Sequence, residues 1–253
     1  MKTYSWGVRG LDELTGGIQS GFITLVYGPT GSGKTTLSTY IPICRIAKDL
    51  IERLGELPEE ARFIVMSTDA GYSEERARQI WDLNGLDAGE VERHVVYVEF
   101  TEFSEQHDYI KKLEKTIAEE GWKPVLLTLD PAVAIYRGQI LRTDMKHRAS
   151  VIGLLTGKLD LQMSILRRLA VIHDCPCFVT SWPPSPIGEA MGGSPPETPV
   201  IGGRQMGYLS KIILELSIPT EGLPDREVLL VKHRSKPVGG RAKFKLCDEG
   251  IRE

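Results

Sequence analysis

The chain has 253 residues, of which 41% are hydrophobic and 26% are charged, and its 31 basic and 34 acidic residues give a net charge of -3. This length suits one large α/β domain over residues 1–253, and the acidic balance excludes attraction of polyanions by global charge, so any nucleic-acid site must be a local basic patch. Four scattered cysteines, no signal-peptide pattern and no uncharged apolar run of ~18 residues predict a cytoplasmic protein without a disulfide framework or a membrane span.

Apolar runs of strand length alternate with amphipathic stretches, which predicts βαβ units around a mainly parallel twisted sheet flanked by helices. The expected strands are 22–27, 62–68, 95–100, 124–130 and 177–181. The expected helices are 34–54, a helix capped by Ser73, 105–119 and 149–172. In the last of these, we expect one buried face formed by Leu154, Leu155, Leu161, Ile165, Leu166 and Leu169.

Residues 182–203 are rich in proline and glycine, so we expect a functional or disordered loop there. After this loop, the segments 210–218, 226–234 and 242–248 predict three strands joined by turns. The predicted fold is therefore an α/β sheet with a C-terminal antiparallel extension.

The segment "GPTGSGKTT" fits the phosphate-loop pattern and lies between a predicted strand and a predicted helix. Its glycines allow backbone N–H groups to surround phosphate oxygens, Lys34 can reach the β and γ phosphates, and the Thr35 hydroxyl can bind Mg²⁺. The segment predicts ATP binding through Gly28, Pro29, Thr30, Gly31, Ser32, Gly33, Lys34, Thr35 and Thr36.

Two carboxylates end neighbouring predicted strands. Asp130 follows the apolar run "PVLLTL", where a charge is expected to face a cation, so it is the second candidate Mg²⁺ ligand; the alternative is an aspartate that caps a loop. Asp69 ends the run "RFIVMST" and should face the same crevice, because ligands lie beyond the carboxyl ends of parallel strands. A carboxylate there can deprotonate the attacking water.

Five segments together resemble the RecA-like recombinase ATPases, and among these the short archaeal paralogues. They are "GVRGLDELTGGIQSGFITLVYGPTGSGKTTL", "TDAGYSEER", "LLTLD" followed by "PAVAIYR", "GGRQMGYLSKIILEL" and "VKHRSKPVGGRAKFKL". The resemblance implies a RecA-type core, ATP and Mg²⁺ binding, DNA binding and a role in recombination or repair. Gly28 lies so near the start that we expect no N-terminal helical domain.

The resemblance also assigns residues and reveals departures. The family's catalytic glutamate falls on Asp69, which is one methylene shorter, so we expect slow hydrolysis. Arg76 should lie against the adenine ring; the alternative is an arginine on the helix surface. Ser181 and Trp182 replace the polar amides that sense γ-phosphate, and the phenylalanine-alanine polymerisation motif is missing, so a long filament is not expected.

The segment 136–150 carries a local excess of three positive charges and corresponds to the family's first DNA loop. It predicts sequence-independent, salt-sensitive DNA binding; the alternative is a solvated charged loop. The candidate DNA contacts are Arg137, Arg142, Lys146 and Arg148. The second DNA loop corresponds to 182–203, where Trp182 and Met191 could stack on bases.

Lys232 and Arg234 lie two residues apart in a predicted strand and should project to one face. In RecA-like assemblies a matching basic pair from the adjacent subunit neutralises charge on the γ-phosphate, so the resemblance implies a homo-oligomer with this pair acting in trans. The alternative is a solvated strand end.

Two other functions share these motifs. A KaiC-like regulator would use the nucleotide to control a protein partner without DNA, but it should carry paired glutamates at the second strand end, and these are absent. A non-enzymatic mediator would bind a recombinase partner without turnover.

Overall fold

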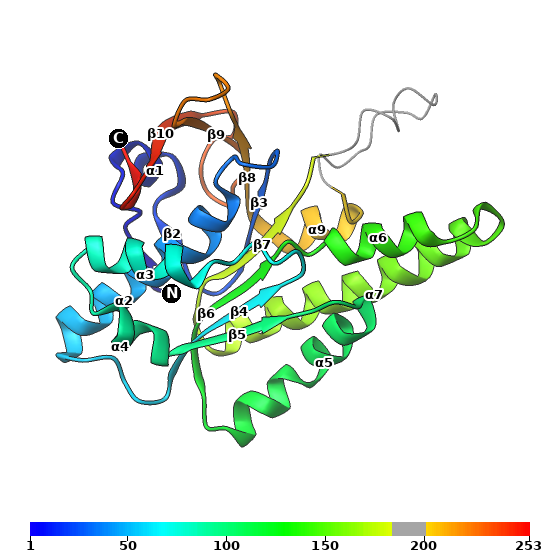
Figure 1. The fold of residues 1–253 in the computed structure, drawn as a ribbon, viewed down its shortest axis with the longest axis horizontal. Helices are drawn as coiled ribbons and strands as arrows, with labels where there is room; N and C mark the ends of the chain where they lie inside the picture. The colour runs from blue at the N-terminus through cyan, green and yellow to red at the C-terminus, as the bar shows by residue number, and fades with distance from the viewer. Residues whose placement is uncertain (184–200) are drawn as a thin grey trace.

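The computed structural model describes residues 1–183 and 201–253. Within them, nine strands form one sheet in the order β11-β10-β9-β8-β3-β7-β6-β4-β5, and β1 and β2 form a separate antiparallel pair (Figure 1). The elements are β1 (Thr3–Tyr4), α1 (Arg9–Thr15), β2 (Ile18–Gln19), β3 (Ile23–Tyr27), the π-helical turn η1 (Thr36–Tyr40), α2 (Ile41–Leu54), β4 (Ala61–Ser67), α3 (Glu74–Leu83), α4 (Ala88–Arg93), β5 (Val95–Glu99), α5 (Phe103–Glu119), β6 (Lys123–Asp130), α6 (Ala134–Arg142), α7 (Met145–Ile172), β7 (Cys177–Ser181), α9 (Arg204–Leu209), β8 (Ser210–Ser217), β9 (Asp225–Lys232), β10 (Arg241–Cys247) and β11 (Gly250–Arg252).

The sheet confirms the predicted mainly parallel arrangement with an antiparallel C-terminal extension. The neighbours from β8 through β3, β7, β6 and β4 to β5 all pair in parallel. The strands β9, β10 and β11 add to β8 in antiparallel fashion. Because the parallel strands run the same way, their carboxyl ends gather at one edge of the sheet, where ligands bind in open α/β sheets.

Helices cover both faces of the sheet (Figure 1). Strand β3 contributes to both sides. Val26 belongs to the hydrophobic cluster that includes residues of η1, α2, α3 and α4, whereas Ile23 and Leu25 belong to the cluster that includes residues of α5, α7 and α9. All five residues of β3 are buried, as expected for a central parallel strand. Two hydrophobic layers therefore hold the strand that carries the phosphate loop.

Local capping explains where two of the helices begin. The Ser73 hydroxyl accepts a hydrogen bond from the Arg76 N–H at 3.2 Å, which confirms the predicted cap of α3. At the start of α5, Glu105 accepts hydrogen bonds from the backbone N–H groups of Thr101 and Glu102 at 3.0 and 3.1 Å. Helix α3 follows β4 after the loop 68–73, and α5 follows β5 after the shorter loop 100–102, so both caps lie in the segments that leave the carboxyl edge of the sheet.

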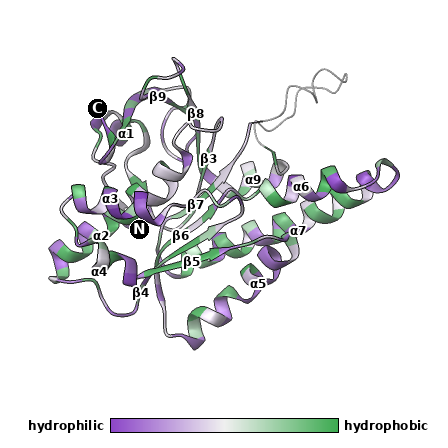
Figure 2. Cartoon of the chain, in the orientation of Figure 1, coloured by the Kyte–Doolittle hydropathy of each residue, from purple (hydrophilic) through white to green (hydrophobic). Residues whose placement is uncertain are grey.

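The helices α6 and α7 form a long hairpin that extends away from the sheet, with apolar as well as polar residues along its outer half (Figures 1 and 2). The predicted basic loop at 136–150 is therefore wrong as a loop, because most of it is helical. The prediction of one buried apolar face on α7 is also partly wrong. Leu155 and Leu166 are buried, but Leu154 is 61% and Leu161 44% exposed. Both lie away from the buried helix face that also carries Leu159 and Met163.

One described helix, α7, is long and apolar enough by length and composition to cross a membrane. The indication is weak, because a core helix can pass the same test. Leu155, Leu159, Met163 and Leu166 of α7 are buried in the hydrophobic layer between this helix and the sheet.

Candidate functional site

The phosphate loop joins β3 to the helical segment that begins near Lys34. Gly31 and Gly33 have φ angles of 77° and 91°, which residues with side chains rarely adopt, so the backbone can curl tightly. A β-carbon on Gly28 would lie 2.5 Å from the Leu216 carbonyl oxygen, so this position also requires glycine. Such a curl at the start of a helix gathers N–H groups that can hold phosphate oxygens.

The Lys34 side chain folds back over this loop. Its ammonium donates hydrogen bonds to the carbonyl oxygens of Gly28 and Pro29, both at 2.9 Å. Burial lowers the pKa of Lys34, and the carboxylates of Asp130 and Asp69 oppose that shift. Phosphate oxygens would offer the ammonium acceptors that carry negative charge, in place of the two neutral carbonyls.

Asp130 ends β6 and is only 8% exposed. The Thr180 hydroxyl on β7 donates a hydrogen bond to its carboxylate. Burial raises the pKa of Asp130, whereas hydrogen bonding from Thr180 and Thr35 opposes the shift. No described lysine or arginine forms an ion pair with this carboxylate. A buried carboxylate beside the Thr35 hydroxyl suits a cation, so these two residues fit Mg²⁺.

Asp69 follows β4 and lies exposed at the strand end. Its Oδ1 accepts a hydrogen bond from the Gly71 N–H at 3.0 Å. Partial burial raises the pKa of Asp69, and the negative charge of Asp130 adds to this shift. The structure thus brings Asp69 to the predicted crevice, and its role as a base stays a prediction.

A cavity of about 450 Å³ contains most of the predicted nucleotide-binding residues. It is lined by Thr30, Gly31, Gly33, Lys34, Thr35, Thr36, Tyr40, Asp69, Gly71, Ser73, Arg76, Asp130, Trp182 and Leu246. Gly28, Pro29 and Ser32 lie in the same loop but do not line the cavity. The cavity therefore places phosphate-loop residues, both carboxylates and Arg76 around one space.

Arg76 lies at this cavity and is held by the C-terminal end of the chain. Its guanidinium donates hydrogen bonds to the carbonyl oxygens of Cys247 and, at 3.0 Å, Asp248. It also donates to the side chain of Gln79 at 2.6 Å. Arg76 is thus not a free arginine on the helix surface. The end of β10 and the turn between β10 and β11 hold it beside the place predicted for the adenine ring. The adenine contact itself stays a prediction.

Sequence reasoning missed Arg226, which contacts the phosphate loop from β9. Its Nε and Nη2 donate hydrogen bonds to the Gly31 carbonyl oxygen at 3.2 and 3.0 Å. A signal was present in the alternation of β9, where Arg226 shares a face with Val228 and Leu230, which are 0% and 1% exposed. A cation in a row of residues facing the core indicates a specific polar partner.

The predicted trans pair, Lys232 and Arg234, does not lie on one strand face. Strand β9 ends at Lys232, so Arg234 is outside the strand and the period-two argument fails for it. The Lys232 ammonium donates a hydrogen bond to the Gly207 carbonyl oxygen at 2.7 Å, and the Arg234 guanidinium lies 5.2 Å from the centre of the Phe22 ring. A role in trans stays a prediction that would require both side chains to leave these contacts.

The four candidate DNA contacts lie on the α6–α7 hairpin but in different settings. The Arg137 guanidinium lies 5.9 Å from the centre of the Trp182 ring, and Arg148 donates a hydrogen bond to the Thr143 carbonyl oxygen at 3.1 Å. Lys146 is exposed at the start of α7. Lys146 is therefore the best placed of the four to meet a phosphate in solution. Met191 lies outside the described residues.

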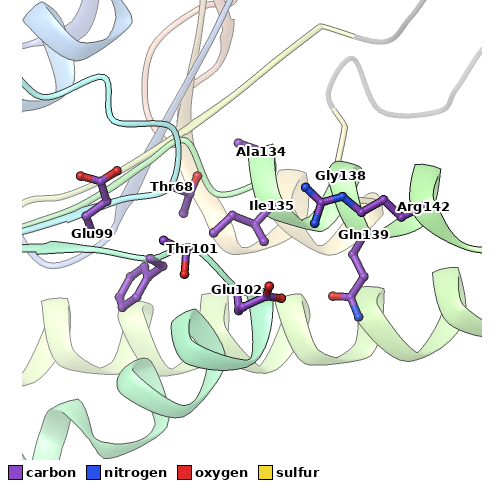
Figure 3. Close-up of a pocket in the computed structure, with 10 residues that line it drawn as sticks. Thr68, Glu99, Thr101, Glu102, Ala134, Ile135, Gly138, Gln139 and Arg142 are labelled. Atoms are coloured by element: carbon purple, nitrogen blue, oxygen red, sulfur yellow. The ribbon is translucent and has the colours of Figure 1, made fainter.

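Arg142 is also exposed, but it lines a hollow between α6 and the strand ends, with its guanidinium turned back along the helix (Figure 3). The hollow has a volume of about 510 Å³. Its lining consists of Thr68, Glu99, Phe100, Thr101, Glu102, Ala134, Ile135, Gly138, Gln139 and Arg142. Two carboxylates share this space with Arg142, so its positive charge is partly offset and it is a weaker candidate for DNA than Lys146.

Comparison with known proteins agrees with the fold and the phosphate-loop site. Curated relatives described as DNA repair and recombination protein RadB include that of Methanobrevibacter smithii, 30% identical over 243 residues, or 96% of this chain and 92% of the relative. The RadB of Methanosphaera stadtmanae is 32% identical over 243 residues, or 95% of this chain and 92% of the relative.

A solved structure described as the crystal structure of the RadB recombinase has a TM-score of 0.71 and 27% identity, and the match covers 98% of each chain. This similarity confirms the predicted RecA-like fold and the predicted resemblance to the short archaeal recombinase paralogues. The family model described as Rad51 matches residues 2–253, and the chain therefore belongs to the Rad51 family.

Proposed function

We propose that the chain binds ATP with Mg²⁺ in the cavity at the carboxyl edge of the sheet, binds DNA without sequence preference, and acts in recombination or repair as a recombinase paralogue or mediator. The observation that carries the proposal is the meeting of Lys34, Thr35 and Asp130 around one cavity beside a curled phosphate loop. Membership of the Rad51 family and the names of the RadB relatives support the DNA-directed role.

Each residue has a definite task in this proposal. The loop N–H groups and the Lys34 ammonium bind the phosphate oxygens, and Thr35 and Asp130 hold the metal side of the site. When bound, Mg²⁺ would supply neutralisation of charge on the β and γ phosphates. Arg76 would orient the adenine ring, because the carbonyl oxygens of Cys247 and Asp248 keep its guanidinium in place.

Hydrolysis should be slow. Asp69 is the carboxylate available to accept a proton from water, but its Oδ1 is engaged by the Gly71 N–H at 3.0 Å. Its side chain is also one methylene shorter than glutamate, and a misplacement of about 1 Å can cost ~10²-fold in rate. Bound ATP would then serve mainly to regulate the binding of DNA or of a recombinase partner.

The test measures ATP binding with Mg²⁺ and DNA binding over a range of salt concentrations, on single- and double-stranded DNA, with and without ATP. The parent should bind ATP, and Lys34→Ala should lose that binding while remaining folded by circular dichroism. DNA affinity should fall steeply with salt for any sequence. Unchanged ATP affinity in Lys34→Ala would refute the nucleotide site, and DNA affinity that does not depend on salt would refute the phosphate-contact mode.

A further inference from the structure

Arg226 occupies an unusual place on β9. It pairs across the strands with Phe244 of β10, which is 1% exposed, and its neighbours on the same face, Val228 and Leu230, belong to the core. The side chain at this end of the row therefore points toward the helical layer and the phosphate loop, not toward solvent on the other face. Arg226 is half-buried in this place, so its guanidinium can reach backbone carbonyl groups of the neighbouring loop.

The partners of Arg226 are backbone carbonyl groups. Its Nε and Nη2 converge on the Gly31 oxygen at 3.2 and 3.0 Å, and its Nη1 donates to the oxygens of Leu223 and Asp225 at 2.7 and 2.8 Å. Four of the five N–H groups of a guanidinium are thereby used. The side chain connects the tip of the phosphate loop to the turn before β9, and no described carboxylate forms an ion pair with it.

The contact determines which way one peptide group of the loop faces. In a trans peptide the carbonyl oxygen and the following N–H point to opposite sides, so a Gly31 oxygen turned toward Arg226 directs the Ser32 N–H away from it. That N–H makes a long contact of 3.3 Å with the Pro29 oxygen, which also accepts the Lys34 ammonium at 2.9 Å. The Ser32 N–H and the Lys34 ammonium therefore converge on the same oxygen and lie on the same side of the loop.

We propose that Arg226 is a positioning residue for the phosphate loop: by holding the Gly31 carbonyl outward, it keeps the Ser32 N–H directed at the phosphate chain of a nucleoside di- or triphosphate. The inference rests on the proposed nucleotide function and adds a residue that does not itself touch the nucleotide. A lysine at this position could keep the positive charge but not the paired Nε and Nη2 donors, because an ammonium has no pair of parallel N–H groups.

The experiment compares the dissociation constants of ADP and of ATP with Mg²⁺ for the parent, Arg226→Ala, Arg226→Lys and Arg241→Ala. The matched control, Arg241, lies on the adjacent strand and pairs with Glu227 on the exposed face. Both Arg226 variants should weaken ADP and ATP by the same factor, about tenfold or more, because a hydrogen bond from a charged donor is lost while the γ-phosphate contacts remain. Arg241→Ala should bind as the parent does.

Five outcomes would overturn the inference. ADP and ATP affinities equal to those of the parent in Arg226→Ala would show that the contact with Gly31 does not matter for binding. Equal affinities in Arg226→Lys would show that the charge suffices without the paired guanidinium donors. A larger loss for ATP than for ADP would indicate direct contact with the γ-phosphate. A lower melting temperature with unchanged dissociation constants in both Arg226 variants would indicate a purely structural role. Absence of ADP and ATP binding in the parent would refute the proposed function itself, and the inference with it.

Discussion

Replacing Asp130 with asparagine should stabilise the nucleotide-free protein while removing its response to ATP with Mg²⁺. The carboxylate is 8% exposed and has no described ion pair, and burial raises its pKa. A group whose pKa is raised in the folded state contributes stability below its unfolded pKa, and that contribution is lost as pH rises through the folded pKa. At pH values above its unfolded pKa, the carboxyl group of Asp130 therefore lowers the stability of the folded protein.

The magnitude follows from two opposing effects. An ion removed from water costs several kcal/mol in a protein interior, and each hydrogen bond to a charged group returns about 1.5–3 kcal/mol. Hydrogen bonding from the hydroxyls of Thr180, Thr35 and Ser38 favours the ionised form of Asp130, so much of the cost is offset. We expect a net gain of ~1 kcal/mol in Asp130→Asn, which corresponds to about 2–4 °C in Tm for a domain of this size.

The assay is thermal unfolding of parent and Asp130→Asn with and without ATP and Mg²⁺. Ligand at about 100 times its Kd stabilises the parent by ~2.7 kcal/mol, so the order of the two melting temperatures should invert when ligand is added. The advantage of the variant without ligand should also shrink as pH is lowered, because Asp130 then becomes protonated in the parent. A nucleotide-free variant that melts below the parent at neutral pH would refute this reasoning.

Three further outcomes are expected. Hydrolysis should disappear in Asp69→Asn and persist or rise by up to ~10²-fold in Asp69→Glu. In the parent, the hydrolysis rate should increase with pH through the raised pKa of Asp69, because only the ionised carboxylate accepts a proton. Parent-like turnover in Asp69→Asn would exclude Asp69 as the general base. In DNA titrations, Lys146→Ala should lower the slope of log affinity against log salt by about one unit and Arg142→Ala by less, whereas equal effects would contradict the different settings of these residues. Arg234→Ala should keep ATP binding but lose turnover, and mixing this variant with Lys34→Ala should restore part of the activity. If the parent's specific activity does not change on dilution and the mixture shows no rescue, Arg234 only packs on Phe22.

The central strands were predictable because their signal is local. The runs that form β3, β4, β6 and β7 are almost wholly apolar, and strands buried on both faces require this composition. The phosphate loop and the Ser73 cap were predictable for the same reason, since a few adjacent residues determine each of them. The two strand-end carboxylates followed from topology, because parallel strands bring their ends together.

The features that were missed depend on partners far along the chain. Strand β11 has three residues and exists through pairing with β10, and helix α6 lacks a clear apolar face and contains Gly138. The resemblance named Arg76 but not its contact with the Cys247 carbonyl oxygen, and the alternation of β9 marks Arg226 without identifying its acceptor, because each acceptor is a backbone carbonyl more than a hundred residues away. The basic segment likewise showed its charge but not its helical form, since charge constrains partners and not backbone geometry.

The nucleotide-free site is costly in a way that favours one class of ligand. Lys34 satisfies its ammonium with two neutral carbonyl oxygens, and burial lowers its pKa; Asp130 is buried with hydroxyl partners, and burial raises its pKa. Each charge is thus disfavoured where it stands. A polyanion alone would relieve Lys34 and aggravate Asp130, and a cation alone would do the reverse. A phosphate chain bound together with a divalent cation would relieve both, so the proposed function predicts tighter binding of ATP with Mg²⁺ than of either component alone.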